Sequence, residues 1–175
     1  ILFFGSDRPY KGLKLLLEAY ARATAHCADL WLIIAGRIRR STMRTIQQLG
    51  NLGEQIILKP MYIPSHKVWT YHLAADAAIF PYHKVSQSGA LITAMGFGLP
   101  VIVSAIGDMP ETLDDNGWVV SPDNASQLAD TLLEATQDLE QLEYFGVRSR
   151  MLIEQCHSPL MVAKRVSSIY EEVRR

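Results

Sequence analysis

Short apolar runs alternate with segments of helical periodicity along this chain, and that alternation constrains its fold more than any other feature. Six runs rich in aliphatic and β-branched residues predict strands: "ILFF" (1–4), "LWLIIAG" (30–36), "QIILK" (55–59), "AAIFPY" (77–82), "PVIVS" (100–104) and "GWVVSP" (117–122). Strands this apolar are covered on both faces. We therefore predict one α/β domain over residues 1–175, a Rossmann-like parallel sheet of about six strands with helices on both faces.

The predicted helices carry signals at their boundaries and on their faces. Four apolar residues share one face of the helix expected over 12–27: Leu13, Leu16, Leu17 and Tyr20. Residues that suit N-cap positions precede three later helices: Ser41 or Thr42, Ser65 and Asn124. The segment 88–98 reads as a helix that stops at Gly96 and Gly98, just before the strand 100–104.

The composition narrows the class of protein. The 175 residues are 49% hydrophobic, and 17 Lys and Arg stand against 18 Asp and Glu, for a net charge of −1. Nucleic-acid binders are typically basic, so we expect no nucleic-acid partner. The two cysteines, Cys27 and Cys156, indicate no disulfide framework and favour a reducing, cytoplasmic compartment. No signal peptide is recognised, and no apolar run reaches the roughly 18 residues of a membrane-spanning helix.

Two loops that follow predicted strands are rich in Lys and Arg. Because ligands of parallel sheets bind at the carboxyl ends of the strands, these loops are candidates for a site. The loop 5–12, "GSDRPYKG", holds Arg8 and Lys11 between two glycines, which suits a phosphate. A solvated loop with two surface cations is the alternative. For the loop 36–40, "GRIRR", we favour a solvated charge cluster over a second phosphate-facing edge.

A short polar segment, "SQSG", opens the helix that follows the fourth strand. The first N–H groups of a helix have no intrahelical partner and lie at the positive end of its dipole, so a diphosphate can bind there. Gly89 allows the backbone to approach closely, while Ser86 and Ser88 add hydroxyl donors. The alternative is a plain serine cap with glycine in the first turn.

Other chemistry-bearing residues give weaker signals. No histidine stands at metal-ligand spacing from a carboxylate or cysteine, so we expect no structural metal. His83, just before "SQSG", either hydrogen-bonds a ligand or is a surface imidazole. Asp108 and Glu111 follow the fifth strand, and we interpret them as carboxylates that stabilise a helix start rather than as an acid–base pair.

The order of these motifs resembles the C-terminal half of family 4 glycosyltransferases over essentially the whole chain. The most specific parts are the spacing from Gly5 to "KG" at 11–12, the segment "AMGFGLPVIVSAIGDMPE", and "NG" before the last strand. The resemblance implies one half of a GT-B fold, in which this domain binds a nucleotide-sugar donor and an N-terminal domain holds most of the acceptor site. Because Ile1 opens directly on a strand, we expect a fragment that lacks the N-terminal domain.

The resemblance also assigns residues of the first loop. Lys11 matches the family lysine that contacts the donor phosphates, and Gly5 matches the first glycine. The family arginine that directly follows this glycine is replaced here by Ser6, and Arg8 stands two residues later as its candidate substitute. We therefore assign Lys11 and Arg8 to catalysis and Gly5 and Ser6 to donor binding.

Further donor contacts follow from the same resemblance. Gly89, Ala90 and Leu91 match the backbone amides that approach the pyrophosphate. The segment 60–62, centred on Met61, falls where the backbone lines the nucleobase pocket. These positions complete the phosphate and base portions of the expected donor site.

The two family glutamates, spaced eight apart, are absent from this sequence. Their positions hold Val85, which offers no polar contact, and Thr93, which offers the ribose a single hydroxyl. We expect Ser86 and Gln87 to take over part of the sugar contact, beside Ser88 at the helix entrance. The identity of the sugar and of the nucleotide (UDP, GDP or ADP) stays open.

The resemblance implies a retaining, metal-independent hexosyltransferase of polysaccharide or glycolipid synthesis, active as the full-length protein and inactive as this domain alone. The nucleotide-sugar is a substrate, so no cofactor is expected. A catalytically inactive nucleotide-sugar-binding or scaffold module is the alternative, and the missing glutamates favour it. An epimerase acting on a nucleotide-sugar is a weaker third hypothesis, because no acid–base pair stands out.

The last segment, 158–175, is amphipathic. Its apolar face is expected to comprise Met161, Val162, Val166, Ile169 and Tyr170. The resemblance implies that this helix crosses onto the N-terminal domain, so we expect the face to be partly exposed in this chain. The cations of the segment either contact anionic lipid peripherally at the inner face of a membrane or form a solvated face: Lys164, Arg165, Arg174 and Arg175.

Overall fold

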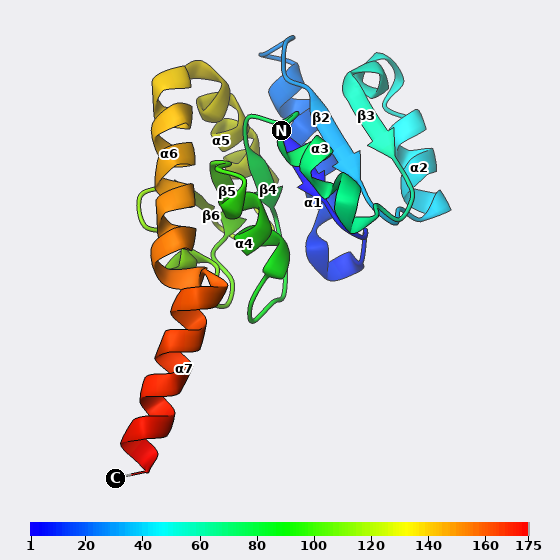
Figure 1. Cartoon of the computed structure of the whole chain (residues 1–175). Coiled ribbons are helices and arrows are strands. Elements are labelled where there is room, and N and C mark those ends of the chain that lie inside the picture. Colours follow the sequence, from blue (N-terminus) through cyan, green and yellow to red (C-terminus); the bar gives the residue numbers. More distant parts are fainter. Residues whose placement is uncertain (175) are drawn as a thin grey trace.

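The computed structural model describes residues 1–174, which form a six-stranded sheet covered by helices (Figure 1). The strands are β1 (Leu2–Phe4), β2 (Leu32–Ala35), β3 (Ile56–Lys59), β4 (Ala78–Phe80), β5 (Val101–Ser104) and β6 (Gly117–Val120). They lie in the order β3-β2-β1-β4-β5-β6, and every neighbouring pair is parallel. The predicted Rossmann-like α/β fold with six strands is thereby confirmed.

Within residues 1–174, seven α-helices and several short turns connect these strands or follow the last of them. The helices are α1 (Leu13–Thr24), α2 (Arg40–Gln47), α3 (Val68–His72), α4 (Gly89–Gly96), α5 (Ala125–Gln137), α6 (Leu139–Leu152) and α7 (Pro159–Val173). The short turns are η1 (Pro9–Lys11), η2 (Gly50–Gln55), η3 (Ser65–Lys67), η4 (Pro110–Thr112) and the π-helical η5 (Ile153–His157).

The sheet separates two apolar cores, because successive side chains of a strand point to opposite faces. On one face, Phe3, Ile34 and Ile102 pack with α1 and α5, and the four predicted residues of α1 are all buried. On the other face, Leu2 and Val101 pack with α4 and with the segment around η5. Helices thus cover both faces of the sheet, as its apolar strands require.

The predicted cap Asn124 is confirmed, and the serine cap that the sequence offered as the alternative for "SQSG" is also present. Ser88 Oγ accepts a hydrogen bond from the Leu91 amide at 3.3 Å and begins α4. Asn124 Oδ1 accepts from the Gln127 amide at 3.0 Å and begins α5. In both helices the capping residue directly precedes the first helical residue, so the local sequence carries the whole signal.

The predicted cap of α2 is wrong. The helix begins at Arg40 with Arg39 at the N-cap position, rather than at Ser41 or Thr42. The carboxylate of Asp7, buried in the loop after β1, accepts hydrogen bonds from the Arg39 amide at 3.1 Å and from Thr42 Oγ1. A residue more than 30 positions away thus takes the capping role, and no local signal could reveal it.

The expected cap at Ser65 is also wrong. Ser65 opens the 3-10 turn η3 after Pro64 and makes no capping hydrogen bond. After β5 the chain forms the single 3-10 turn η4, with Glu111 in its first turn and Asp108 before it, rather than an α-helix. Short 3-10 turns and α-helix starts share the same residue preferences, which explains the error.

Helix α7 extends away from the rest of the molecule (Figure 1). Its five predicted apolar residues are exposed, as expected, with fractions from 39% for Met161 to 70% for Tyr170. In Figure 1, α7 points beyond the edge of the sheet toward which the β2 and β3 arrows run, which is the carboxyl edge. Within the described residues, no helix is long and apolar enough to cross a membrane.

Candidate functional site

The strand order leads us to expect a crevice at the carboxyl ends of β1 and β4. The chain leaving β1 enters α1 on one face of the sheet, whereas the chain leaving β4 enters α4 on the other face. This divergence is the topological switch point, where open parallel sheets bind their ligands. The two loops that flank it, 5–12 and 81–88, are those that the sequence singled out.

The side chain of Lys11 folds back over Gly5 at this crevice. Lys11 ends the 3-10 turn η1, and its Nζ would lie 2.8 Å from a Cβ built on Gly5. Gly5 also has φ of 127°, a conformation that favours glycine, so this position leaves room for the ammonium. The ammonium lies 5.3 Å from the centre of the Tyr82 ring, within reach of a cation–π contact.

The charge of Lys11 is not balanced by a nearby carboxylate. Among residues 1–174, no carboxylate oxygen lies within 4.0 Å of its Nζ. Burial lowers the pKa of Lys11 from its ordinary value, and the charge of Arg8 lowers it further. Because a negative charge nearby would stabilise the ammonium, this crevice is suited to an anion.

The N-terminus of α4 contributes backbone donors to the same crevice. The Leu91 amide is engaged by Ser88 Oγ, and the Leu91 side chain is buried in the core. Within the described residues, the Gly89 and Ala90 amides have no hydrogen-bond partner. No atom outside the helix and its chain neighbours comes within 4 Å of a Cβ built on Gly89, so the space beside it is open. Two of the three predicted amides are therefore available to a ligand.

Tyr82 connects Lys11 with the start of α4. Its ring lies beneath the Lys11 ammonium, and the Ser88 side chain is near enough to act on the pKa of its hydroxyl. Burial raises the pKa of Tyr82 to about 12, while Ser88 acts in the opposite direction. Tyr82 therefore stays neutral at pH 7 and forms the floor between the cation and the helix entrance. Sequence reasoning missed this role, because Tyr82 reads simply as the end of a strand.

The two loops contact each other directly. Gly12 has φ of 69°, and a Cβ there would lie 1.7 Å from the Pro81 carbonyl oxygen. The His83 amide donates to the Tyr10 carbonyl at 2.7 Å. The second loop is braced from behind, because the Asp108 amide donates to the Ser86 carbonyl at 3.1 Å. The backbone thus fixes both loops around the crevice.

The remaining predicted polar residues of the site lie around its rim. Ser86 and Gln87 are exposed, and Ser6 is half-buried. Thr93 is exposed, but its hydroxyl donates to the Gly89 carbonyl at 2.8 Å, which leaves only its oxygen lone pairs for a ligand. Val85, at the position of the missing first glutamate, packs against the α4 side of the core.

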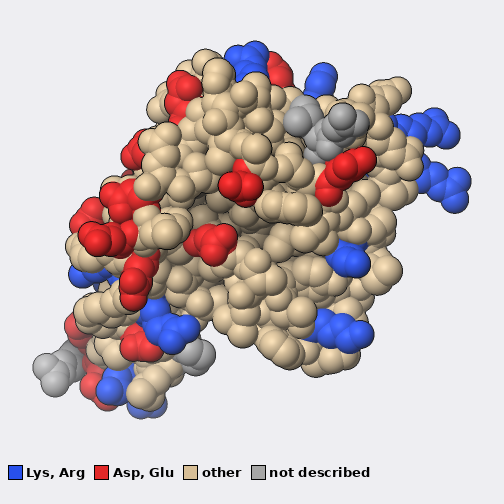
Figure 2. All heavy atoms as spheres, turned by 90° about the horizontal axis from the view of Figure 1, so that it is seen from above, with Lys and Arg blue, Asp and Glu red and all other residues tan. Residues whose placement is uncertain are grey.

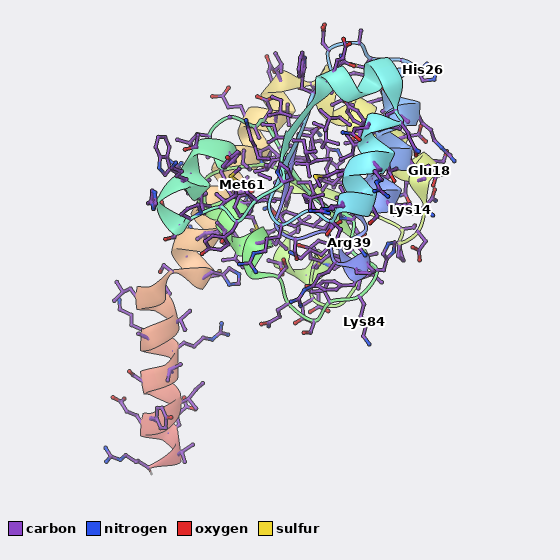
Figure 3. All side chains as sticks on the ribbon, turned by 90° about the vertical axis from the view of Figure 1, so that its right-hand side faces the viewer. Lys14, Glu18, His26, Arg39, Met61 and Lys84 are labelled. Atoms are coloured by element: carbon purple, nitrogen blue, oxygen red, sulfur yellow. The ribbon has the colours of Figure 1, made fainter. Side chains whose placement is uncertain are left out.

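Arg8 is exposed and lines a different hollow from the one at α4. This hollow, of about 490 Å³, opens between α1 and α2 and is lined by Asp7, Arg8, Lys14, Arg39, Thr45 and His83. Lys14 and Arg39 are labelled in Figure 3. Arg39 donates to Asp7 Oδ2 at 3.1 Å, so this arginine is engaged within the protein. The effect of Arg8 on Lys11 is electrostatic: its positive charge lowers the pKa of Lys11.

Met61 lies apart from the Lys11 and α4 cluster. It is 61% exposed, and Figure 3 shows it well separated from Lys84 at the tip of the second loop. The adjacent Tyr62 ring lies 5.2 Å beneath the Arg37 guanidinium. Residues 1–174 hold no group of three or more His, Cys, Asp or Glu side chains that could bind a metal ion.

Another hollow, of about 560 Å³, lies at the opposite edge of the sheet. It is formed by α3, α6 and the segments before β4 and β5, and its charged lining includes Asp76, Glu143 and Glu154. Figure 2 shows this edge of the molecule, with acidic side chains gathered on the α6 side. Arg150 also lines this hollow, but three acids against one cation disfavour an anion there, so the candidate site stays at the switch point.

The fold, strand order and switch-point loops define a Rossmann-like α/β domain with a crevice suited to an anionic ligand. The chain belongs to the family "Glycosyl transferases group 1", whose model matches residues 1–138. The resemblance drawn from the sequence is thereby confirmed.

Curated relatives agree with this assignment. D-inositol 3-phosphate glycosyltransferase of Mycolicibacterium gilvum is 32% identical over 142 residues, covering 77% of this chain and 31% of that protein. O-antigen chain mannosyltransferase B of Escherichia coli is 25% identical over 139 residues, covering 78% of this chain and 36% of that protein. The chain thus spans about a third of the length of these relatives.

Solved structures share the fold. The C-terminal domain of the group 1 glycosyl transferase LpcC from Francisella tularensis has a TM-score of 0.79 and 23% identity, covering 90% of this chain and 85% of that chain. Anabaena Alr3699/HepE, solved in complex with UDP, has a TM-score of 0.84 and 16% identity, covering 96% of this chain and 48% of that chain. The architecture is therefore that of one half of a GT-B fold, as the sequence predicted.

Proposed function

We propose that this chain is the donor-binding half of a retaining glycosyltransferase, a hexosyltransferase that moves a sugar from a nucleotide-sugar to an acceptor in polysaccharide or glycolipid synthesis. One observation carries the proposal: the half-buried Lys11 ammonium has no carboxylate partner and shares a crevice with the unpartnered Gly89 and Ala90 amides. A diphosphate would satisfy all of these donors together.

The proposed chemistry follows from charge. In the transfer, the bond between the sugar C1 and the diphosphate oxygen breaks, a new bond forms from C1 to the acceptor oxygen, and the nucleoside diphosphate leaves and takes up the proton of the acceptor hydroxyl. Negative charge grows on the diphosphate as the bond breaks, and Lys11 and the α4 amides would stabilise it where it develops. Arg8 would add a weaker, longer-range contribution, since its side chain is exposed.

The donor class rests on the relatives. Two relatives are named as a glycosyltransferase and a mannosyltransferase, and HepE was solved in complex with UDP. We propose UDP, GDP or ADP as the nucleotide portion, with the segment around Met61 against the base. Ser86, Gln87 and Ser88 would face the sugar, and Thr93 would accept one ribose hydroxyl in place of the missing glutamate.

The proposed partner domain would lie over the crevice. Helix α7 leaves the molecule on the carboxyl side of the sheet, so a surface that covers its apolar face would also lie near the switch point (Figure 1). We propose that this surface is an N-terminal acceptor domain of the same polypeptide, in a cytoplasmic protein. Contact of Lys164 and Arg165 with anionic lipid at the inner membrane face is a second proposal for the same helix.

A titration of the isotope-labelled chain with UDP, GDP and ADP tests the donor site. The proposal predicts weak binding of at least one nucleotide, with amide shifts confined to the loops 5–12 and 81–88 and the start of α4. If none of the three ligands moves those resonances at millimolar concentration, the donor-site proposal fails. Adenosine and uridine without phosphates serve as controls, and we expect them to leave the Gly89 and Ala90 amides unchanged.

A catalytically inactive nucleotide-sugar-binding or scaffold module is a second candidate, favoured by Val85 at the position of a family glutamate. Turnover by the full-length protein separates the two functions. Transfer or hydrolysis of a nucleotide-sugar would exclude the scaffold module. Binding without turnover across a panel of nucleotide-sugars and acceptors would exclude the transferase. We expect this domain alone to bind but not to turn over its donor.

A further inference from the structure

His83 connects three loops at the carboxyl edge of the sheet. Its amide donates to the Tyr10 carbonyl at 2.7 Å in the loop after β1. Its imidazole Nε2 lies 3.4 Å from the place of a Cβ on Gly12, so the ring packs against that glycine. Its Nδ1 contacts the Asp123 carboxylate in the loop between β6 and α5.

Both residues that flank Lys11 along the chain are therefore held by His83. Tyr10 is fixed through its carbonyl, and Gly12 through contact with the ring. The Lys11 ammonium itself lies over Tyr82, the residue before His83. A shift of the His83 ring would move the Lys11 loop relative to the Tyr82 floor without any direct contact between His83 and a ligand at α4.

The backbone of Asp123 allows its carboxylate to be removed without new strain. Asp123 has φ of 58°, in the left-handed region that glycine adopts freely and aspartate adopts more often than most residues, and its side chain is 74% exposed. Among residues 1–174, one other non-glycine residue has positive φ, Asp115 at 53°, and its carboxylate accepts a hydrogen bond from the Tyr144 hydroxyl at 2.8 Å. Replacement of either aspartate by glycine is therefore compatible with the local backbone.

The other charged groups around His83 do not compete for this contact. The hollow that His83 lines also holds Asp7, Arg8, Lys14 and Arg39, and the only acid among them, Asp7, is engaged by Arg39 and Thr42. Among the described residues, the carboxylate that contacts the His83 ring is that of Asp123. We take this contact to fix the orientation of the ring.

We infer that His83 and Asp123 form a positioning pair that sets the Lys11 loop against Tyr82 for diphosphate binding. The inference rests on the proposed function and adds to it two residues that touch no ligand. The pair acts through Lys11, and its loss weakens nucleotide binding while the fold stays intact.

The substitution Asp123→Gly tests the pair, because glycine relaxes the backbone while removing the carboxylate. We expect the melting temperature to stay equal or rise, and the Kd for the tightest-binding nucleotide among UDP, GDP and ADP to increase about 3- to 10-fold, the effect of losing one polar contact. A merely structural residue would change both quantities in the same direction. The matched control is Asp115→Gly, which relaxes the second strained position, and we expect it to leave the Kd unchanged.

Substitutions of His83 complete the test. His83→Leu keeps bulk but cannot donate to Asp123, so we expect the same loss of affinity as for Asp123→Gly and no further loss in the double variant. His83→Asn retains an N–H near the Nδ1 position and should recover at least half of the lost affinity. If Asp123→Gly binds the nucleotide as the wild type does, the positioning inference is wrong and the donor site stands. If the wild type binds none of the three nucleotides, the proposed function fails and the inference falls with it.

Discussion

The crevice between β1 and β4 and the helix α7 both leave groups without partners, but groups of opposite kinds. At the crevice, a half-buried ammonium has no carboxylate and two helix amides have no acceptor within the described residues. On α7, large apolar side chains are exposed along one 15-residue helix: Leu160, Met161, Val162, Val166, Ile169, Tyr170 and Val173. The first region lacks a negatively charged partner. The second lacks a surface that would cover its apolar side chains.

This difference indicates different partners. Convergent donors around a small crevice suit a compact anion, whose binding costs little conformational entropy because the loops already contact each other. A continuous apolar stripe on a projecting helix suits a macromolecular surface. The crevice should therefore respond to substitution in ligand affinity, whereas α7 should respond in association.

The largest expected effect comes from Gly12, which joins the two loops of the crevice. Gly12 has φ of 69°, and the Pro81 oxygen lies 1.7 Å from the place that an alanine Cβ would occupy, so Gly12→Ala forces the loops apart. We expect a loss of about 2–4 kcal/mol in the free energy of unfolding, measured by urea denaturation. Gly89→Ala is the control, because open space beside Gly89 and normal helix geometry predict no loss and a gain of up to about 1 kcal/mol.

Substitution of Lys11 should weaken nucleotide binding without lowering stability. We expect Lys11→Met to weaken nucleotide binding by about 1.5–3 kcal/mol, roughly 10- to 150-fold in Kd by titration calorimetry, because a charged hydrogen bond is lost. Stability at pH 7 should stay equal or rise, because a desolvated cation without a partner is removed. Lys164→Met on α7 is the matched control and should change neither quantity.

The lowered pKa of Lys11 also sets a pH dependence. Between its folded-state pKa and about 10.4, the unfolded chain holds more protons than the folded chain, so this residue makes stability rise with pH in that window. Nucleotide binding should weaken over the same window as the ammonium loses its proton. If Lys11→Met keeps the wild-type pH profile of binding, another group carries that dependence.

Helices α4 and α7 both begin with a serine N-cap, so the same substitution can be compared in the two regions. Ser88 and Ser158 each accept from the amide three residues later at 3.3 Å. Ser88→Ala should cost about 1 kcal/mol of global stability, because α4 is packed in the core. Ser158→Ala should leave global stability unchanged and only increase amide exchange in the first turn of α7. Equal global losses would show that α7 is integrated with the core.

The smallest effect on stability is expected from the apolar face of α7. Val166→Ser combined with Ile169→Ser should change the free energy of unfolding by less than about 0.5 kcal/mol, because both side chains are exposed. Sedimentation velocity at high concentration should show less self-association than for the wild type. Glu171→Gln, on the same helix, serves as the control. A clear loss of stability in the double variant would mean that α7 packs on its own domain.

The sequence predicted features that depend on neighbouring residues and missed those that depend on distant ones. The apolar runs located all six strands, and Asn124 was identified as a cap because it directly precedes its helix, as does Ser88, whose cap was the alternative interpretation. The α2 cap was missed because it comes from Asp7, a residue on another loop. Tyr82 was likewise missed, since only the folded chain brings its ring beneath Lys11.

The central claim is that Lys11 and the first amides of α4 bind one pair of linked phosphoryl groups. A titration with inorganic pyrophosphate, followed by NMR at the Gly89 and Ala90 amides and at the Lys11 side chain, tests it without a base or sugar. We expect the three signals to move together with a single Kd in the wild type. In Lys11→Met, the Kd that the two amides report should increase at least 10-fold. Separate Kd values for Lys11 and the amides, or amide shifts unaffected by Lys11→Met, would contradict the claim.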